Sequence, residues 1–408
     1  MSSHPRRWTN GRLGDVVELT TGFPFKSSDY AQSPGVRLLR GDNVAQQRIR
    51  WDGAKYWSAN DPEVQAYGLA VGDVVVAMDR PWIEAGLKAS RITEGDVPSL
   101  LVQRVARMRA GPALDQVFLH YVVQAPGFVQ HVKSVHTGTA VPHISGAQIR
   151  EYQFLLPPLE EQRRIAGVLG ALDDLACANV EEAARLDSLA DALGSRFMRD
   201  LRVDTVVPLS EVADVSKGYS YKSSELMPGK GRWLVNLKNV GRGGSFQPRG
   251  FKPLGGDPKP KHFIDGGDIV VAQTDLTQAR DVIGRPVRVR RGRLKGDLIA
   301  SLDLVVVRPK SGMNREYLMA ALSTPTFRDH ALGRCNGTTV LHMAAGTVPS
   351  FTVPLPDQSA LASLQGSVAP LREAADAAFV GAEEVASVRD ELLPLLMSGR
   401  VRVGEATV

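Results

Sequence analysis

The sequence is poor in cysteine and contains no long apolar run. Its two cysteines, Cys177 and Cys335, are too few for a disulfide framework or a thiolate metal site. No stretch approaches the ~20 apolar residues that a membrane-spanning helix needs, and residues 1–10 are polar, with two arginines and no apolar run behind them. We therefore expect a cytoplasmic protein with reduced thiols, no bound metal and no membrane partner.

Motifs of three catalytic classes are also missing. The sequence has no Asn-Pro-Pro-aromatic run for adenine methylation, no Gly-x-x-x-x-Gly-Lys-Ser/Thr phosphate loop and no Glu-x-Lys tripeptide of the common nuclease core. The missing phosphate loop is informative because ATP hydrolysis needs a cradle of backbone N–H groups, which glycine spacing normally reveals. We expect a noncatalytic chain with no catalytic residue and no cofactor of its own.

An internal repeat is the strongest positive feature. A chain of 408 residues with 43% hydrophobic residues exceeds what one core usually supports, so two or more folded domains are expected. The two copies keep a nearly constant offset, which indicates a duplicated fold. The matching positions are Leu13/Leu209, Gly22/Gly218, 25–28/221–224, Asn43-Val44/Asn239-Val240, 72–77/267–272, Pro126/Pro325, Phe128/Phe327, His131/His330, Gly138/Gly337, Thr139/Thr338 and His143/His342.

Each copy divides into two unlike parts. The first part is rich in Gly, Pro and short β-branched runs bounded by turn residues, which predicts mixed α/β structure dominated by strands. The second part is one long helical pattern. The sequence therefore predicts an α+β protein with two mixed domains in tandem repeat, each followed by a long helix. The predicted boundaries are 1–155 and 204–353 for the mixed domains, and 156–203 and 354–401 for the helical regions.

The helical regions carry a coiled-coil pattern. In the first region, apolar residues recur at seven-residue spacing, with Asn179 at one of these positions. A polar residue there fixes register and partner choice, or it is simply a partly exposed asparagine. Pro370 and Pro394 are expected to kink or interrupt the second helix. The predicted seam consists of Ile165, Leu172, Asn179, Leu186 and Leu193 in the first region and Leu361, Leu371 and Leu392 in the second.

Charge separates the two parts more sharply than hydrophobicity does. Residues 159–200 hold nine acidic and five basic side chains, and residues 357–400 hold seven and three. The two helical regions together therefore have a net charge of −8. Because the whole chain has a net charge of +5, the remaining parts carry +13. A positive surface confined to the mixed domains indicates nucleic-acid binding, because phosphates supply most of the affinity there. The densest basic stretch spans residues 285–295; alone, it is also compatible with a solvated loop.

Several of these residues carry a family resemblance. The run LLPPLEEQRRI at 155–165 resembles the opening of the helical region in specificity subunits of Type I restriction-modification enzymes. The run RDELLPLLMSG at 389–399 is similar to the close of their second such region, and MDRPWI at 78–83 resembles a loop of their target-recognition domains. One departure is the shorter opening LPDQ at 355–358.

The resemblance implies two target-recognition domains held apart by an antiparallel helix pair. Each domain would read one half of a bipartite, asymmetric site in double-stranded DNA. Methyltransferase (M) and restriction/translocase (R) subunits would be the partners, and S-adenosylmethionine, ATP and Mg²⁺ would bind to those partners.

The candidate DNA-binding residues lie in the loops after the repeated Gly-Asp strands, in the threonine-histidine turns and in the basic stretch. Arg and Lys donate to phosphates or to guanine, a carboxamide such as that of Gln273 pairs with adenine, and Trp82 stacks on bases or wedges between them. Closing a domain edge is an equally good explanation of the threonine-histidine turns. The candidates are Lys26, Arg80, Trp82, Lys88, Arg91, Thr139 and His143 in the first domain and Lys222, Gln273, Thr274, Arg280, Arg285, Arg288, Arg290, Thr338 and His342 in the second.

Two alternative functions belong to other classes. His143 and His342 together could serve as general acid and base of a phosphodiesterase. The second copy argues against this, because it lacks the hydroxyl residue two positions after its histidine. The other alternative is a two-headed DNA-binding regulator whose helices close a homodimer. A copurifying methyltransferase would favour the restriction-modification interpretation, and a self-dimer would favour the regulator.

Overall fold

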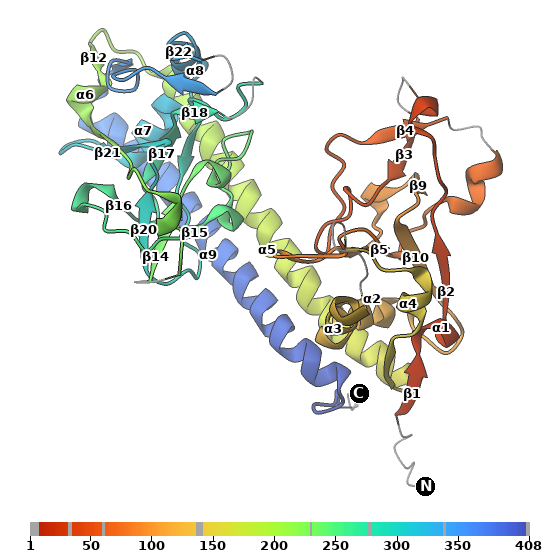
Figure 1. The fold of residues 1–408 in the computed structure, drawn as a ribbon. Helices are drawn as coiled ribbons and strands as arrows, with labels where there is room; N and C mark the ends of the chain where they lie inside the picture. The colour runs from red at the N-terminus through yellow and green to blue at the C-terminus, as the bar shows by residue number, and fades with distance from the viewer. Residues whose placement is uncertain are drawn as a thin grey trace. The chain divides into compact units, whose positions relative to one another are not determined.

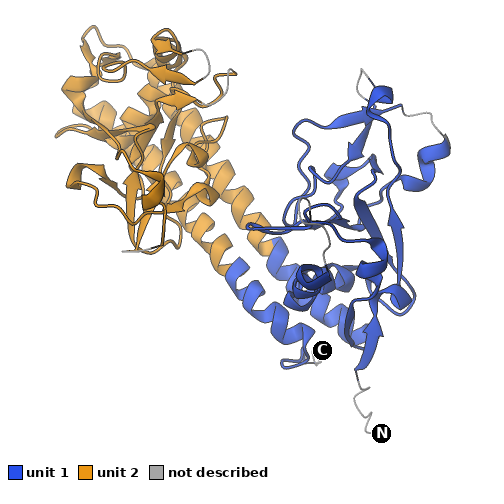
Figure 2. Ribbon diagram, viewed as in Figure 1, with its two compact units in different colours: residues 1–174, 386–408 blue, residues 175–385 orange. Residues whose placement is uncertain are grey.

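The chain folds into two compact units, which Figure 2 distinguishes by colour. The computed structural model describes residues 8–31, 35–58, 62–135, 142–228, 231–275, 279–337 and 340–404. Unit 1 comprises residues 1–174 and 386–408, and unit 2 comprises residues 175–385. Each unit therefore combines one strand-rich part of the sequence with sections of both long helices. No helix within these ranges is long and apolar enough to cross a membrane.

Unit 1 is built around a four-stranded antiparallel sheet with the order β2-β10-β5-β8. Its strands alternate between two cores: Val74 and Val76 pack with the helices, whereas Val75 and Ala77 pack under the opposite face. The elements are β1 (Thr9–Arg12), α1 (Leu13–Val16), β2 (Val17–Thr21), β3 (Val36–Leu39), β4 (Lys55–Trp57), β5 (Val74–Ala77), β6 (Trp82–Ile83), β7 (Gly86–Leu87), β8 (Ala89–Arg91), β9 (Ser99–Leu101), β10 (Val105–Ala110), α2 (Gln116–Gln124), α3 (Pro126–Val135), α4 (Gly146–Arg150) and β11 (Gln153–Leu156) (Figure 1).

Unit 2 repeats this plan. Its sheet has the order β13-β21-β17-β19, and β14 pairs with β20 in parallel as β3 pairs with β9. The predicted α+β tandem repeat is confirmed. The elements are β12 (Val206–Pro208), α6 (Leu209–Val212), β13 (Ala213–Lys217), β14 (Arg232–Val235), β15 (Lys252–Pro253), β16 (Phe263–Ile264), β17 (Ile269–Ala272), β18 (Thr274–Asp275), β19 (Pro286–Arg288), β20 (Asp297–Ala300), β21 (Leu304–Pro309), α7 (Arg315–Leu322), α8 (Pro325–Leu332), β22 (Cys335–Asn336), β23 (Leu341–Met343) and β24 (Thr352–Pro354).

One repeated glycine has a clear steric role. A Cβ atom at Gly22 would lie 2.2 Å from the backbone carbon of Val102, and one at Gly218 would lie 2.0 Å from the carbonyl oxygen of Ser301. Only glycine allows this close approach of two backbone segments. The same crossing therefore explains why glycine appears in both copies.

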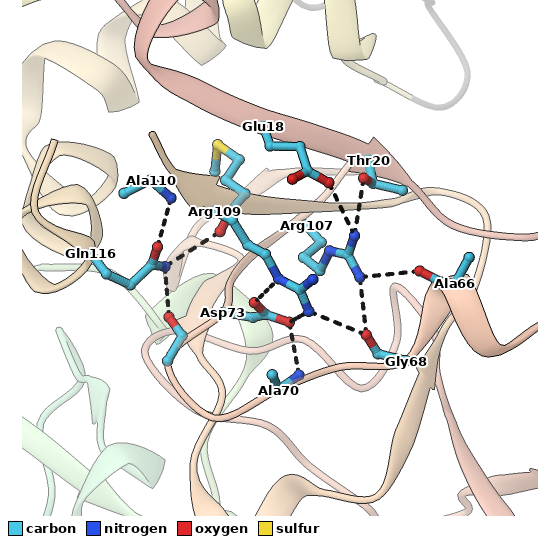
Figure 3. A network of polar contacts seen from close by, with 12 residues as sticks. Glu18, Thr20, Ala66, Gly68, Ala70, Asp73, Arg107, Arg109, Ala110 and Gln116 are labelled. Atoms are coloured by element: carbon cyan, nitrogen blue, oxygen red, sulfur yellow. Dashed lines mark hydrogen bonds and ion pairs between the residues drawn. The ribbon is translucent and has the colours of Figure 1, made fainter. Parts of the chain in front are cut away.

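The repeated Gly-Asp motif is explained by a buried ion pair, shown for unit 1 in Figure 3. Arg109 binds both carboxylate oxygens of Asp73, with Nε–Oδ1 and Nη2–Oδ2 distances of 2.7 and 2.9 Å. Asp73 also accepts the backbone N–H of Ala70 at 2.8 Å. Beside it, the buried Arg107 donates to the carbonyl oxygen of Gly68 at 3.0 Å and to the hydroxyl of Thr20 at 3.1 Å. These contacts fix the start of β5.

Unit 2 contains the same pair at the start of β17. Arg308 contacts Asp268 with an Nη2–Oδ2 distance of 2.7 Å, and Asp268 accepts the backbone N–H of Asp265 at 3.1 Å. Arg315 adds a second guanidinium at 3.3 Å. Both Gly-Asp motifs therefore serve the same structural purpose, which is to hold the strand that leads into a candidate DNA-binding loop.

Two long helices complete the units: α5 (Leu159–Asp200) and α9 (Gln358–Met397). The side chain of Asp357 accepts the backbone N–H of Ala360 at 2.8 Å, which confirms it as a cap of α9. The helices run antiparallel within each unit. In unit 1, Arg389 lies 3.3 Å from Asp173, and in unit 2, Arg372 lies 2.7 Å from Asp187. Of the predicted effects of Pro370 and Pro394, an interruption of the helix is wrong, because α9 continues through both residues.

The residues of the predicted seam are all buried or partly buried. Ile165 and Leu361 are buried, and Leu172, Leu186, Leu193, Leu371 and Leu392 are partly buried. By contrast, Leu175 and Leu189, which the seven-residue pattern places beside the seam, are 50% and 49% exposed. In unit 2 the buried helix positions include four small residues, Ala183, Ala190, Ala375 and Ala382, besides larger ones such as Leu364 and Val368. The amide of Asn179 lies against Gly381 of α9.

Candidate nucleic-acid interface

In unit 1, the structure brings the loop after β5 against the histidine segment. Asp79 and His143 form an antiparallel β-bridge. The backbone N–H of Ile144 donates to the carbonyl oxygen of Met78 at 2.9 Å, and the N–H of Arg80 donates to that of Pro142 at 2.7 Å. Two sequence-distant candidates thus lie side by side at the end of one strand.

Unit 2 repeats this pairing. Thr274 in β18 lies opposite His342 in β23, and the N–H of Met343 donates to the carbonyl oxygen of Gln273 at 2.8 Å. On its other side, β23 pairs with β22, where Asn336 lies opposite His342. His143 and His342 belong to different units, and each pairs with strands of its own unit.

The exposed candidates of unit 1 surround a small hairpin. Strands β6 and β7 pair through Trp82–Leu87 and Ile83–Gly86, and Trp82 is 40% exposed. Arg80 at the base of the hairpin is exposed and has a positive φ of 44°. Lys88 is partly buried, and its pKa is lowered chiefly by that burial. Lys26 is exposed beside a short 3₁₀ turn.

The candidates of unit 2 are distributed differently. Lys222, Arg280 and His342 are exposed, and Arg285 is partly buried. Thr274, however, is 5% exposed, so its side chain is part of the fold rather than of the surface. The side-chain amide N–H of Gln273 donates to the carbonyl oxygen of Leu302. This bond uses an amide group that recognition of a base would also need. Thr139 and Thr338 lie outside the described residues.

The structure places Arg288 and Arg290 against the helices rather than on an open surface. Arg288 binds both carboxylate oxygens of Asp376, with an Nη1–Oδ2 distance of 2.7 Å, and retains only 15% side-chain exposure. Arg290 retains 12% and contacts Asp376 at 3.0 Å and Asp187 at 2.7 Å. Their guanidinium groups are neutralised within unit 2, so we do not include them in the proposed interface.

Arg372 extends this cluster into an ion-pair network, which consists of Arg288, Arg290, Arg372, Asp187, Asp191 and Asp376. Arg372 binds Asp187 at 2.7 Å and also contacts Asp191. Burial alone would lower the pKa of Arg372, but Asp191 and Asp187 outweigh burial and raise it. The network joins strand β19 to both helices.

Arg91 of unit 1 occupies the position equivalent to Arg288. Arg91 lies opposite Val74 in the sheet, as Arg288 lies opposite Ile269. On this side of the sheet, burial lowers the pKa of His120 to about 4, and the charges of Arg91 and Arg389 add to the effect. The candidate Arg91 therefore also faces the helical side of its sheet.

Three further residues join the candidate surfaces although sequence reasoning did not select them. Lys133 at the end of α3 places its Nζ 3.9 Å from the centre of the Trp82 ring. Arg104 lies 3.9 Å from Asp79, and Asn336 lies beside His342. A lone Lys, Arg or Asn carries no distinctive signal in one sequence.

Comparison with known protein families bears directly on these surfaces. Residues 5–186 match the family model of the Type I restriction modification DNA specificity domain. Over this stretch, which is just under half of the chain, the sequence is similar to that family. The matched stretch includes most of unit 1, with the loop after β5, the β6–β7 hairpin and His143.

Two curated relatives are similar to this chain over fewer than 180 residues each. The EcoAI Type I specificity subunit of Escherichia coli is 34% identical over 174 residues, which is 42% of this chain and 28% of that protein. The MjaVIII specificity subunit of Methanocaldococcus jannaschii is 30% identical over 175 residues, covering 42% and 40%. The matched regions thus span well under half of these relatives.

A solved structure extends the likeness in fold to nearly the whole chain. The Type I restriction-modification S subunit from M. genitalium superimposes with a TM-score of 0.53 at 12% identity and covers 96% of both chains. At this identity the likeness concerns fold alone. This likeness in fold agrees with the presence of unit 2, residues 175–385, which is built like unit 1.

Proposed function

We propose that this chain is the sequence-reading specificity subunit of a Type I restriction-modification complex and that each unit recognises one half of a bipartite, asymmetric DNA target. The observation that carries the proposal is the repeated pairing of a post-strand loop with a histidine segment. In unit 1 this pairing joins Asp79 to His143, and in unit 2 it joins Thr274 to His342. The similarity of residues 5–186 to DNA specificity domains supports DNA as the ligand of this repeated site.

Asymmetry of the target follows from the differences between the two loops. The frame of the site is shared, whereas the side chains presented from it differ, as in MDRP at 78–81 against QTDL at 273–276. Cations such as Arg80 and Arg280 donate to phosphates or to guanine acceptors in the major groove. Imidazole and amide groups such as those of His342 and Asn336 bond base edges or phosphates.

A noncatalytic role in the cytoplasm completes the proposal. The matched family is a DNA-recognition family, and the sequence lacks the methyltransferase, ATPase and nuclease motifs. Methyltransferase (M) and restriction (R) subunits would carry out the reactions. S-adenosylmethionine, ATP and Mg²⁺ would bind to those subunits rather than to this chain.

The test is to express the chain with the methyltransferase encoded beside it and to map methylated bases across the host genome. We expect a single split motif with an unread gap, which disappears when this chain is omitted. Copurification with the methyltransferase is the second readout. A self-dimer that binds DNA without any change in methylation would instead support the regulator. The comparisons support neither that alternative nor the phosphodiesterase.

A further inference from the structure

The β6–β7 hairpin of unit 1 exposes apolar side chains on both of its faces. Trp82 and Ile83 are neighbours on one strand, so their side chains point to opposite faces. They are 40% and 39% exposed, and neither belongs to a hydrophobic core of the described residues. Folding of the unit does not explain a tryptophan and an isoleucine in this position.

The environment of Trp82 differs from that of the other tryptophans. Trp8, Trp51 and Trp233 each donate their indole N–H to a protein oxygen at 2.8–2.9 Å. Trp57 packs edge-on against Phe25. The centre of the Trp82 ring lies 3.9 Å from the ammonium group of Lys133, a cation–π contact that Trp51 also makes, with Arg37 at 4.3 Å. Trp82 is distinguished by its exposure: it is 40% exposed, whereas the other four tryptophans are partly buried.

The hairpin is rigidly attached at its base. The N–H of Lys88 donates to the carbonyl oxygen of Pro81 at 2.7 Å, and the N–H of Ala77 donates to that of Lys88 at 2.9 Å. Gln47 donates its backbone N–H to the carbonyl oxygen of Ala89 at 2.9 Å. The two strands therefore continue the β5–β8 ladder outward, and the apolar tip is carried on a defined support.

Basic residues lie close to this apolar hairpin. Arg80 and Lys88 flank it in sequence, and Lys133 contacts it from α3. The loop also carries two acids: Asp79, which lies 3.9 Å from Arg104, and Glu84, which is exposed at the turn of the hairpin. Exposed apolar side chains with cations nearby fit duplex DNA, in which stacked bases lie between phosphates. A purely apolar protein surface would not complement the cations.

We propose that the β6–β7 hairpin enters the DNA groove and that Trp82 wedges between two bases of the half-site read by unit 1, with Lys133 beside the adjacent phosphate. This inference rests on the proposed function. It adds a recognition mode, because unstacking energy depends on the base step and thus contributes specificity without hydrogen bonds to base edges.

The experiment uses the full chain with its copurifying methyltransferase and a 40-bp duplex containing the mapped site. 2-Aminopurine, whose fluorescence rises on unstacking, is placed at each position of the first half-site in turn. We expect a rise at one step with the wild type and with Trp82→Phe, and none with Trp82→Ala. Trp82→Ala should also weaken binding roughly 10- to 100-fold. Lys133→Gln should keep the rise and reduce the salt slope by about 1.

Matched controls separate the possible outcomes. Val71→Ala, which truncates an exposed apolar side chain outside the hairpin, should leave both readouts unchanged. A rise of the same size with Trp82→Ala would overturn the wedge, because base flipping by the methyltransferase would then explain it. Loss of the methyltransferase from a folded Trp82→Ala chain would identify the hairpin as a protein contact and also overturn it. Absence of DNA binding by the wild type would contradict the proposed function itself.

Discussion

The two units share a frame but use equivalent positions differently. Arg91 and Arg288 lie at the same place in equivalent sheets. Arg288 is neutralised by Asp376 of α9, whereas Arg91 lies near a buried histidine, His120. The difference teaches that duplication preserved the sheet and its anchoring, while the contacts made from it diverged. A basic residue in one copy therefore does not predict the role of its counterpart in the other.

The largest expected effect concerns His120, which corresponds to Met319 in unit 2. Burial lowers its pKa to about 4, with Arg91 and Arg389 adding to the effect. Because the folded pKa lies below the unfolded value of ~6.5, its contribution to stability is complete above pH ~6.5 and is lost as pH falls toward 4. Between pH 7 and pH 4, the free energy of unfolding should fall by about 3 kcal/mol more in the wild type than in the His120→Met variant.

Hydrogen exchange in α2 measures this loss within unit 1, and exchange in α7 of unit 2 is the internal control. The α7 peptides should respond identically in wild type and variant. Equal acid sensitivity of α2 in both proteins would show that His120 is not held neutral.

The second prediction concerns the ion-pair network of unit 2. Arg288→Ala combined with Arg290→Ala leaves Asp376 and Asp187 without these partners and should lower the free energy of unfolding of unit 2 by about 2 kcal/mol, allowing for the partial exposure of Asp376. Thermal and denaturant unfolding measure this change. The slope of log affinity against log salt should stay constant, because both arginines are already paired with carboxylates within unit 2.

Arg291→Ala is the matched control, because Arg291 lies in the same stretch but pairs with Asp265, which is 72% exposed. The Arg291→Ala substitution should lower the free energy of unfolding of unit 2 by less than about 0.5 kcal/mol. A flatter salt slope with unchanged stability in the double variant would return Arg288 and Arg290 to the DNA interface.

The smallest expected effect tests one exposed cation in each unit. Arg80→Gln and Lys222→Gln should each reduce the salt slope by about 1 and weaken binding to all sequences alike, if both contact phosphates. Titrations of a target duplex at several salt concentrations measure this slope. Arg185→Gln on α5, where Arg185 pairs with Glu181 at 3.2 Å, should change nothing. A slope that falls in only one variant would confine phosphate binding to that unit.

Much of the fold was predictable because it depends on local patterns. Nearly constant offsets revealed the repeat, and the long helical patterns revealed α5 and α9. The seven-residue pattern did not distinguish the buried Ala183 from Leu175 and Leu189, which are about half exposed, because burial depends on the partner helix as well as on spacing.

The candidate site was predictable only in outline. The loops after the Gly-Asp strands and the histidine turns do come together. The ion pairs of Arg288 and Arg290 within the basic stretch could not be predicted, because a charge count does not show which face of a strand meets the helices. Arg288 lies opposite Ile269, whose side chain belongs to the helix-facing core, and this determines its direction. Lys133 could not be assigned, because its contact with Trp82 joins residues 51 positions apart.

The central claim is that each unit reads its own half of the target. The most direct measurement is methylation mapping after residues 10–155 are exchanged for the equivalent domain of a related specificity subunit. The account predicts that one element of the methylated motif changes to that of the donor, while the other element remains. A change in both elements, or in neither, from a complex that still methylates DNA would contradict it.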